Sequence, residues 1–313
     1  MRLPPPPGQL IDVGGHRLHI HCAGTGPVVV FESALGASSL TWRDVQALVS
    51  GFARACAYDR AGFGWSDAGP LPRTAGRIAT ELRALILAAD IPSPYVLVGH
   101  SFGGLVARLY ASRHPADLAG LVLLDPPILE YWRHPSEERQ ALLDRGAALC
   151  RHGERAARLR VTDLLVAFVR LGALNVARAC GRLISAGTFR RSDEGVLVPA
   201  GKLAPDVLDI AVRSWTHSKF FEALGSQIAS VPASAAEVID DQDFGTLPLA
   251  VVSGELNADA VQLSRHADLA ARSRRGRHVV ATGSGHWIPL DRPDVVAGVI
   301  RDVIAGATEP RPV

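Results

Sequence analysis

Strand-like and helix-like segments alternate along the first 127 residues of this 313-residue chain. Apolar runs typical of buried strands occupy residues 26–33, 53–60, 95–98 and 118–125. Helix-like segments lie between them, at residues 41–50, 73–90 and 104–115. This alternation predicts βαβ units, in which helices cover both sides of a mostly parallel sheet.

The alternation stops after Pro127 and resumes at Leu247. At the N-terminal side, before the strand at 26–33, the sequence predicts a hairpin of two strands around Gly14-Gly15. The resumed elements are a strand at 247–254, a helix at 259–273, a strand at 277–282 and a helix at 293–305. Between Pro127 and Leu247, the sequence predicts amphipathic helices at 136–150, 154–171, 173–185 and 205–223. We therefore predict an α/β core formed by residues 1–127 and 240–313, with an inserted helical cap at 128–239.

Composition excludes several classes of protein. Hydrophobic residues make up 48% and charged residues 20% of the chain, which is typical of a folded globular protein. The formal net charge of +2 gives no electrostatic reason to expect nucleic acid or an anionic membrane as a partner. The basic segment 272–277 is interpreted as a solvated face. The N-terminus lacks the apolar region of a signal peptide, so the expected location is cytoplasmic.

The cysteine and histidine spacings predict no metal site. The cysteines Cys22, Cys56, Cys150 and Cys180 are far apart and form no CxxC pair. The first two lie in apolar strand-like runs and are expected to be buried thiols, while pairing of the other two is left open. His19 and His21 alternate on one strand face, but no third ligand lies near them in sequence.

The strongest chemical signal is the segment Gly99-His100-Ser101-Phe102-Gly103. It has the G-x-S-x-G pattern of a nucleophile elbow, with an apolar strand before it and a helix after it. The sharp turn tips the serine hydroxyl out of the C-terminal edge of the sheet, and its flanks need glycine because larger side chains would clash. The following helix adds N–H groups and a positive dipole end near a developing oxyanion. Ser101 is therefore the candidate nucleophile.

Together with this elbow, the segments YDRAGFGWSD (58–67) and GSGHWIPLDRPD (283–294) resemble those of α/β-hydrolase fold proteins with a helical cap. That group contains esterases, lactonases, haloperoxidase-like enzymes and haloalkane dehalogenases. The resemblance spans both ends of the chain and implies an eight-stranded, mostly parallel sheet flanked by helices. Asp59-Arg60 and the Gly62-Phe63-Gly64 turn are interpreted as scaffold near the rim of the active site.

The resemblance also implies the partners of Ser101. His286 is the expected base, because family members carry their catalytic histidine in this loop after the last strand. Most of the family places the acid three residues after the glycine that ends the strand at 247–254. In this chain the glycine is Gly254 and the third residue after it is Asn257. An asparagine cannot stabilise an imidazolium as a carboxylate does. The family's other placement is one strand earlier, where Asp125 stands. Asp125 is the predicted acid and Asp259 the alternative.

A serine at the elbow favours acyl transfer through an oxyanion and an acyl-enzyme. Epoxide hydrolases and dehalogenases of this fold instead use an aspartate, which forms an alkyl-enzyme ester. The predicted oxyanion donors are the N–H groups of Phe102 and Ala34, and a shift of one residue in the second loop would give Leu35. Many relatives have His-Gly at the start of that loop, where this chain has Glu32-Ser33; Glu32 is interpreted as structural.

The cap is expected to close an apolar pocket over the sheet. Its aromatic residues are Tyr131, Trp132, Phe168, Phe189, Trp215, Phe220 and Phe221. The residues expected to bind substrate are Leu35, Trp132, Trp215 and Trp287. We predict a serine hydrolase, without metal or cofactor, that cleaves a medium-sized hydrophobic carboxylic ester or lactone. The alternatives are a cofactor-free perhydrolase or C–C bond hydrolase with the same triad, and a non-catalytic ligand-binding receptor on the same fold. The oligomeric state is left open.

Overall fold

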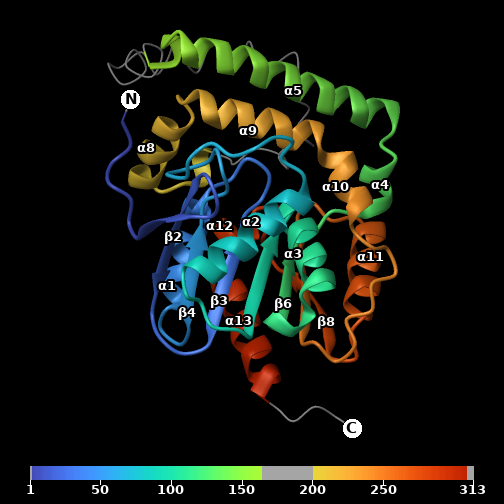
Figure 1. Ribbon diagram of the computed structural model, residues 1–313. Coiled ribbons are helices and arrows are strands. Elements are labelled where there is room, and N and C mark those ends of the chain that lie inside the picture. The colour runs from blue at the N-terminus through green and yellow to red at the C-terminus, as the bar shows by residue number, and fades with distance from the viewer. Residues whose placement is uncertain (1, 164–199, 309–313) are drawn as a thin grey trace.

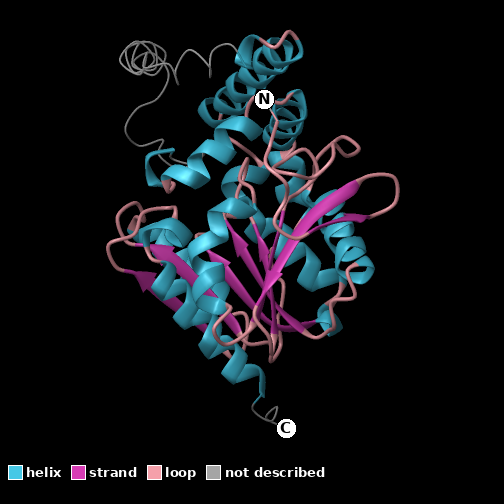
Figure 2. Ribbon diagram, turned by 90° about the vertical axis from the view of Figure 1, so that its left-hand side faces the viewer, coloured by secondary structure: helices cyan, strands magenta, loops and turns pink. Residues whose placement is uncertain are grey.

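The computed structural model describes residues 2–163 and 200–308, and its centre is an eight-stranded sheet. The strands, in sheet order, are β1 (Gln9–Asp12), β2 (Arg17–Ala23), β4 (Arg54–Tyr58), β3 (Val28–Glu32), β5 (Tyr95–His100), β6 (Leu118–Leu124), β7 (Leu249–Gly254) and β8 (Gly276–Ala281). The pairs β1–β2 and β2–β4 are antiparallel, and the remaining neighbours are parallel. Figure 2 shows the resulting twisted sheet between helices. The predicted mostly parallel sheet of eight strands is confirmed.

Helices cover both faces of the sheet, as Figures 1 and 2 show. One face carries α2 (Ala75–Ala88), α3 (Phe102–Arg113) and α11 (Ala260–Ala270). The other carries η1 (Ser39–Trp42), α1 (Arg43–Val49), α12 (Ile288–Asp291) and α13 (Pro293–Thr308). Strands β3 and β5 are buried along their whole length, which explains why their sequences are apolar without alternation.

Helix α2 illustrates how local sequence sets these elements. Thr74 caps its N-terminus by accepting a hydrogen bond from the Arg77 N–H, which satisfies one of the free donors of the first turn. Ile78, Leu82 and Leu85 recur at helical spacing and are buried against the sheet. The helix predicted from this spacing is confirmed.

Between β6 and β7, the described residues contain helices and no strand. They are α4 (Leu129–Arg133), α5 (Glu137–Arg158), η4 (Ala200–Lys202), α8 (Pro205–Ser214), α9 (Ser218–Ala229) and α10 (Val231–Glu237). Figure 1 shows them stacked over the sheet, with α5 and α9 side by side. The helix predicted over 205–223 is interrupted between α8 and α9, and the one predicted over 136–150 continues to Arg158. The helix predicted at 173–185 lies outside the described residues.

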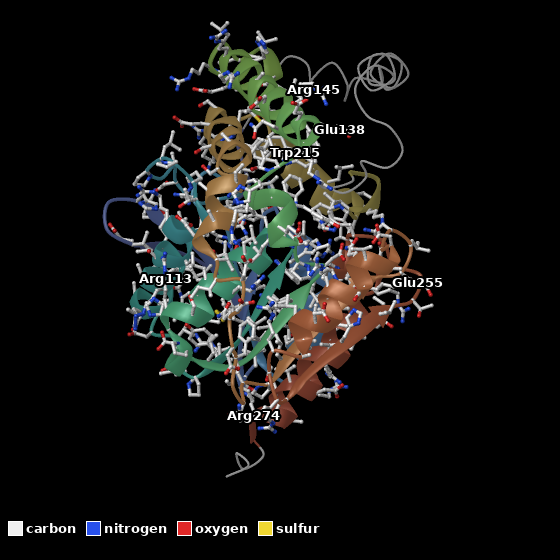
Figure 3. All side chains as sticks on the ribbon, turned by 90° about the vertical axis from the view of Figure 1, so that its right-hand side faces the viewer. Arg113, Glu138, Arg145, Trp215, Glu255 and Arg274 are labelled. Carbon is white, nitrogen blue, oxygen red and sulfur yellow. A yellow bond between two sulfur atoms is a disulfide. The ribbon has the colours of Figure 1, made fainter. Side chains whose placement is uncertain are left out.

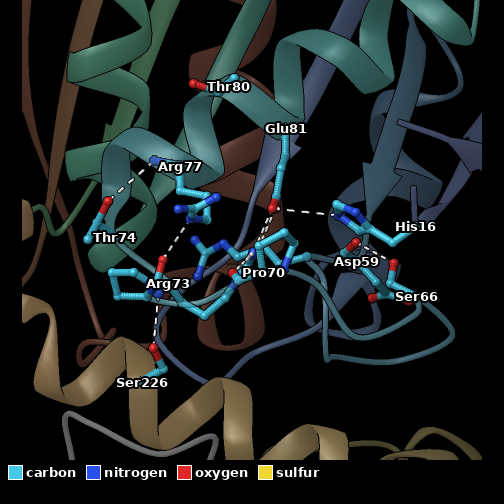
Figure 4. A network of polar contacts seen from close by, with 12 residues as sticks. His16, Asp59, Ser66, Pro70, Arg73, Thr74, Arg77, Thr80, Glu81 and Ser226 are labelled. Carbon is cyan, nitrogen blue, oxygen red and sulfur yellow. Dashed lines mark hydrogen bonds and ion pairs between the residues drawn. The ribbon is translucent and has the colours of Figure 1, made fainter. Parts of the chain in front are cut away.

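The inserted helices are tied to the core at the N-terminus of α2. The amides of Arg73, Ala75 and Gly76 donate to Ser226 Oγ (2.9 Å), Ser234 Oγ (2.9 Å) and Glu237 Oε2 (2.6 Å). Figure 4 shows the Ser226 contact beside a buried ion pair, in which Arg73 makes hydrogen bonds of 2.6 and 2.5 Å to Glu81. The first amides of a helix are free donors at the positive end of its dipole, so acceptors from α9 and α10 bind well here.

The expectation of free thiols at Cys22 and Cys56 was wrong, because the two residues form a disulfide. They lie directly opposite each other on the antiparallel strands β2 and β4, with a Cα–Cα distance of 4.0 Å. In the sequence β3 separates these strands, so the spacing of the cysteines could not reveal the pairing. Cys150 is a buried free thiol, and Cys180 lies outside the described residues.

The basic segment 272–277 is at the opposite end of the molecule from the inserted helices, where Figure 3 labels Arg274. Two of its arginines are paired: Arg272 lies 3.5 Å from Asp241, and Arg277 lies 2.8 Å from Asp302. Ion pairs of this kind are typical of a solvated surface. Across the described ranges, no helix has the length and apolar character needed to cross a membrane.

Candidate active site

Ser101 stands in the sharp turn between β5 and α3. Its backbone has φ 52° and ψ −120°, a left-handed conformation that is strained for a residue other than glycine. The Ser101 N–H donates to Leu124 O at 2.9 Å, which fixes the turn to the neighbouring strand β6. A Cβ at Gly99 would lie 2.5 Å from Gly103 O, and a Cβ at Gly103 would lie 2.5 Å from Glu32 O. Both flanking positions therefore require glycine, as expected of a nucleophile elbow.

The structure brings Asp125 and His286 together. Asp125 directly follows β6, and its buried carboxylate accepts a hydrogen bond of 2.6 Å at Oδ2 from His286 Nδ1. His286 lies in the loop after β8, and its carbonyl oxygen accepts a second bond of 2.8 Å from His100 Nε2. The Asp125 carboxylate thus orients the imidazole through one ring nitrogen, while His100 of the elbow holds the backbone of His286.

The two other carboxylates near this loop have different partners. Asp259 is exposed and caps α11, where its Oδ1 accepts the Gln262 N–H at 2.7 Å. Glu255 is also exposed, and its Oε2 accepts the Gly283 N–H at 2.8 Å. Of the candidate acids, the structure places Asp125 against the histidine.

Gln262 is a residue of this site that sequence reasoning missed. Its Nε2 donates to Asp125 Oδ1 at 2.9 Å, so both oxygens of the carboxylate are occupied. Gln262 lies in the first turn of α11, three residues after the capping Asp259. Nothing in the local pattern distinguishes it from a solvent-exposed helix residue.

The electrostatics favour a charged Asp125 and a neutral His100. Burial would raise the pKa of Asp125, but the hydrogen bond and charge of His286, with smaller effects of His266 and His100, hold it below its ordinary value. Burial, and then the charge of His286, lower the pKa of His100 to about 3. His100 is therefore neutral at pH 7, and its Nε2 carries the hydrogen that it donates to the His286 carbonyl.

The predicted oxyanion donors lie on two adjacent segments. Phe102 is the first residue of α3, so its N–H has no partner within the helix. Ala34 and Leu35 are buried in the loop after β3. That loop touches the elbow, because Glu32 O and Ser33 O are the atoms nearest to a Cβ built on Gly103. The structure thus brings the two predicted halves of an oxyanion hole side by side.

The predicted substrate residues fall into different environments. Trp215, labelled in Figure 3, lies below α5 and lines a small cavity of about 10 Å³. Mostly apolar side chains surround it, among them Phe63 and Phe220, and Gly36 also lines it. Leu35 joins the main core cluster, and Trp132 is half-buried against the same cluster. Trp287 is buried, with ring centroids 5.1 Å from His100 and 6.0 Å from His286.

His19 and His21 do not share a site. The His19 ring binds Asp59 Oδ2 at 2.9 Å and Pro7 O at 2.5 Å. The His21 ring lies 3.4 Å from Gln46 Oε1. These contacts hold the N-terminal segment and helix α1 to the sheet, and we interpret both histidines as structural.

Parts of the chain are similar in sequence to curated proteins. The Bacillus subtilis (strain 168) protein YqjL is 39% identical over 104 residues, which are 33% of this chain and 41% of that protein. The matches cover 41%, 20% and 15% of the first three curated relatives, so the chain spans less than half of each.

Solved structures match over nearly the whole chain. A thermophilic esterase from Thermogutta terrifontis has a TM-score of 0.64 at 22% identity, covering 94% of this chain and 95% of that one. Epoxide hydrolase VrEH1 from Vigna radiata has a TM-score of 0.68 at 19% identity, covering 95% and 97%. At these identities the likeness establishes the fold. A model of the alpha/beta hydrolase family matches residues 18–299, and this chain therefore belongs to the alpha/beta hydrolase family.

Proposed function

We propose that this protein is a serine hydrolase that cleaves a carboxylic ester or lactone through an acyl-enzyme. Ser101 is the nucleophile, His286 the general base and Asp125 the acid that orients it. The observation that carries the proposal is the 2.6 Å hydrogen bond between His286 Nδ1 and Asp125 Oδ2, in a loop held by His100 of the strained elbow that carries Ser101. A carboxylate at Nδ1 leaves Nε2 free to accept a proton, which is the tautomer a general base needs.

In the proposed reaction, His286 Nε2 takes the hydroxyl proton of Ser101 as the oxygen attacks the substrate carbonyl. Asp125 stabilises the imidazolium that forms. The N–H groups of Phe102 and Ala34 bind the oxyanion of the tetrahedral intermediate. The imidazolium then protonates the leaving alkoxide. A water molecule, activated by the same histidine, attacks the acyl-enzyme and restores the free serine.

The substrate is proposed to be of medium size and hydrophobic. The support is the mostly apolar lining that Trp215 and Phe220 form next to Gly36 of the loop after β3, under the inserted helices. The space between these side chains, about 10 Å³, has room for about one water molecule, so a substrate group would enter by displacing them. We propose that residues 128–239 act as a cap that determines which acyl or alcohol group fits. An apolar group that displaces these side chains would gain free energy from leaving water without needing charged partners.

The test is hydrolysis of p-nitrophenyl esters together with covalent labelling by a fluorophosphonate. The wild type should turn over the ester, and mass spectrometry should locate the label on Ser101. Ser101→Ala should lose both reactions while keeping the wild-type thermal unfolding curve. An Ser101→Ala protein with the parent rate would contradict the proposal, and tight ligand binding without turnover would favour a receptor. A panel of esters and lactones then defines the substrate class.

A further inference from the structure

A buried ion pair lies next to the loop that would supply the second oxyanion donor. Glu32 ends β3 and is 0% exposed, and Arg60, two residues after β4, is 2% exposed. Arg60 Nε donates to Glu32 Oε1 at 2.6 Å, and the Tyr58 hydroxyl donates to Glu32 Oε2. Both carboxylate oxygens are therefore hydrogen-bonded, as a buried charge requires.

The other two nitrogens of Arg60 hold the loop itself. Nη1 donates to Ala34 O at 3.1 Å, and Nη2 donates to Ser33 O. In a planar trans peptide, the C=O of one residue and the N–H of the next point in opposite directions. Drawing the Ser33 and Ala34 carbonyls toward Arg60 therefore turns the N–H groups of Ala34 and Leu35 away from it. These are the two N–H groups that the sequence offers as the second oxyanion donor.

The same guanidinium also contacts the side chain of the residue that would supply the first donor. The Arg60 Cζ atom lies 5.2 Å from the centroid of the Phe102 ring. Phe102 follows the nucleophile, and its N–H is the other predicted donor. One side chain thus contacts both segments of the oxyanion hole. Only arginine offers donors in a fixed fork that can hold a carboxylate and two carbonyl oxygens together.

We propose that Arg60, fixed by Glu32 and Tyr58, is a positioning residue that orients the N–H groups of the oxyanion hole. The inference rests on the proposed serine hydrolase function. Glu32 neutralises the guanidinium, so Arg60 acts through orientation and not as a free charge. Because a donor displaced by about 1 Å can cost about 100-fold in rate, loosening this clamp should affect the transition state far more than substrate binding.

The test compares Glu32→Gln with Glu81→Gln. Both substitutions remove the charge of a buried carboxylate paired with arginine, but Glu81 is hydrogen-bonded to Arg73 before α2 (Figure 4) and not to Arg60. The variants are assayed for p-nitrophenyl butyrate turnover. They are also assayed for inhibition by an alkyl trifluoromethyl ketone, which forms a tetrahedral oxyanion adduct, and by the methyl ketone of the same chain length, which does not.

We expect Glu32→Gln to lower kcat about 10- to 100-fold and to raise the inhibition constant of the trifluoromethyl ketone by the same factor. KM and the methyl ketone constant should stay within about twofold, since neither depends on the oxyanion. Glu81→Gln should lower the thermal midpoint and leave these constants unchanged. Arg60→Lys, which keeps the charge without the fork, is the second variant and should behave like Glu32→Gln.

The inference and the proposed function fail in different ways. If the wild type is active but Glu32→Gln and Arg60→Lys keep kcat and the trifluoromethyl ketone constant, the positioning role is wrong and the hydrolase function stands. A change confined to KM, or an equal loss of kcat in Glu81→Gln, also overturns the positioning role. If the wild type neither hydrolyses esters nor reacts with a fluorophosphonate at Ser101, both proposals are overturned.

Discussion

Asp125 Oδ2 and His286 Nδ1 are 2.6 Å apart, although the two residues are separated by 161 positions in the chain. Topology explains the contact, because β6, β7 and β8 are parallel neighbours whose ends lie at one edge of the sheet. The Asp125 N–H donates to Val252 O at 2.7 Å, and the residue adopts a φ of 43°. The acid is therefore held by the neighbouring strand in a conformation that few residues adopt, and it points to the histidine loop.

The first prediction separates the two candidate acids. Asp125→Asn should lower kcat by about 1,000- to 10,000-fold, because an amide cannot stabilise the imidazolium and permits the wrong tautomer. Asp259→Asn should keep the wild-type rate and stability, since asparagine caps helices as well as aspartate does. Ester hydrolysis and thermal unfolding of both variants provide the measurements. Loss of activity in Asp259→Asn alone would show that the acid is assigned wrongly.

Local patterns in the sequence were enough to predict most of this fold. Apolar runs bounded by turns identified the strands, and the glycines around Ser101 identified the elbow, because both signals depend on near neighbours. Asp125 required the family resemblance as well. Gln262 and Arg60 could not be assigned from sequence, because their roles depend on which strand ends meet. The Cys22–Cys56 bond was missed for the same reason, since sheet order differs from chain order.

The second prediction concerns the hydrogen bond from Gln262 to Asp125. Gln262→Met keeps the helix and the backbone bond to Asp259 but removes the side-chain donor. A hydrogen bond to a charged group contributes about 1.5–3 kcal/mol, so kcat should fall about tenfold if part of that energy fixes the carboxylate during the reaction. Steady-state kinetics of ester hydrolysis by the wild type and Gln262→Met measure this change in kcat. An unchanged kcat would mean that His286 alone orients Asp125.

A third prediction tests the cavity under the inserted helices. Trp215→Ala should enlarge it and shift the preference among p-nitrophenyl esters toward longer acyl chains, because buried methylene groups would fill the new space at about 0.8 kcal/mol each. Trp215→Phe is the matched control and should shift the preference much less. The comparison is made on kcat/KM for the C2 to C10 series. Identical chain-length profiles in all three proteins would place the acyl pocket elsewhere.

The fourth prediction is a pH dependence of stability centred on His19. Burial would lower the pKa of this histidine, but its hydrogen bond to Asp59, the charge of Asp59 and the contact with Pro7 O raise the pKa above its ordinary value. A raised pKa in the folded state means that the stabilisation is fully present below about pH 6.5 and is lost as the pH rises through the folded-state value.

Urea unfolding at pH 6 and pH 9 checks this expectation. The wild type should lose more stability over that interval than His19→Gln, whose side chain carries no proton to lose. Parallel changes in the two proteins would show that His19 is not the group responsible. The protection factors of the first strand, which correct for the faster intrinsic exchange at the higher pH, should fall in the wild type, since the imidazolium supplies the bond to Pro7 O.

The last prediction concerns the bond between Cys22 and Cys56, which closes a loop of sequence separation 34. Closing such a loop restricts the unfolded chain by about 3 to 4 kcal/mol at 25 °C. The double substitution to alanine should therefore lower the free energy of unfolding by about this amount, whereas Cys150→Ala, at a buried free thiol, should show only the cost of a small cavity. Non-reduced peptide mapping of the wild type should find the two cysteines linked. Disulfides persist in oxidising compartments, so rapid thiol trapping in the source cell also tests the predicted cytoplasmic location: recovery of the linked peptide would contradict that location, and recovery of two free thiols would support it.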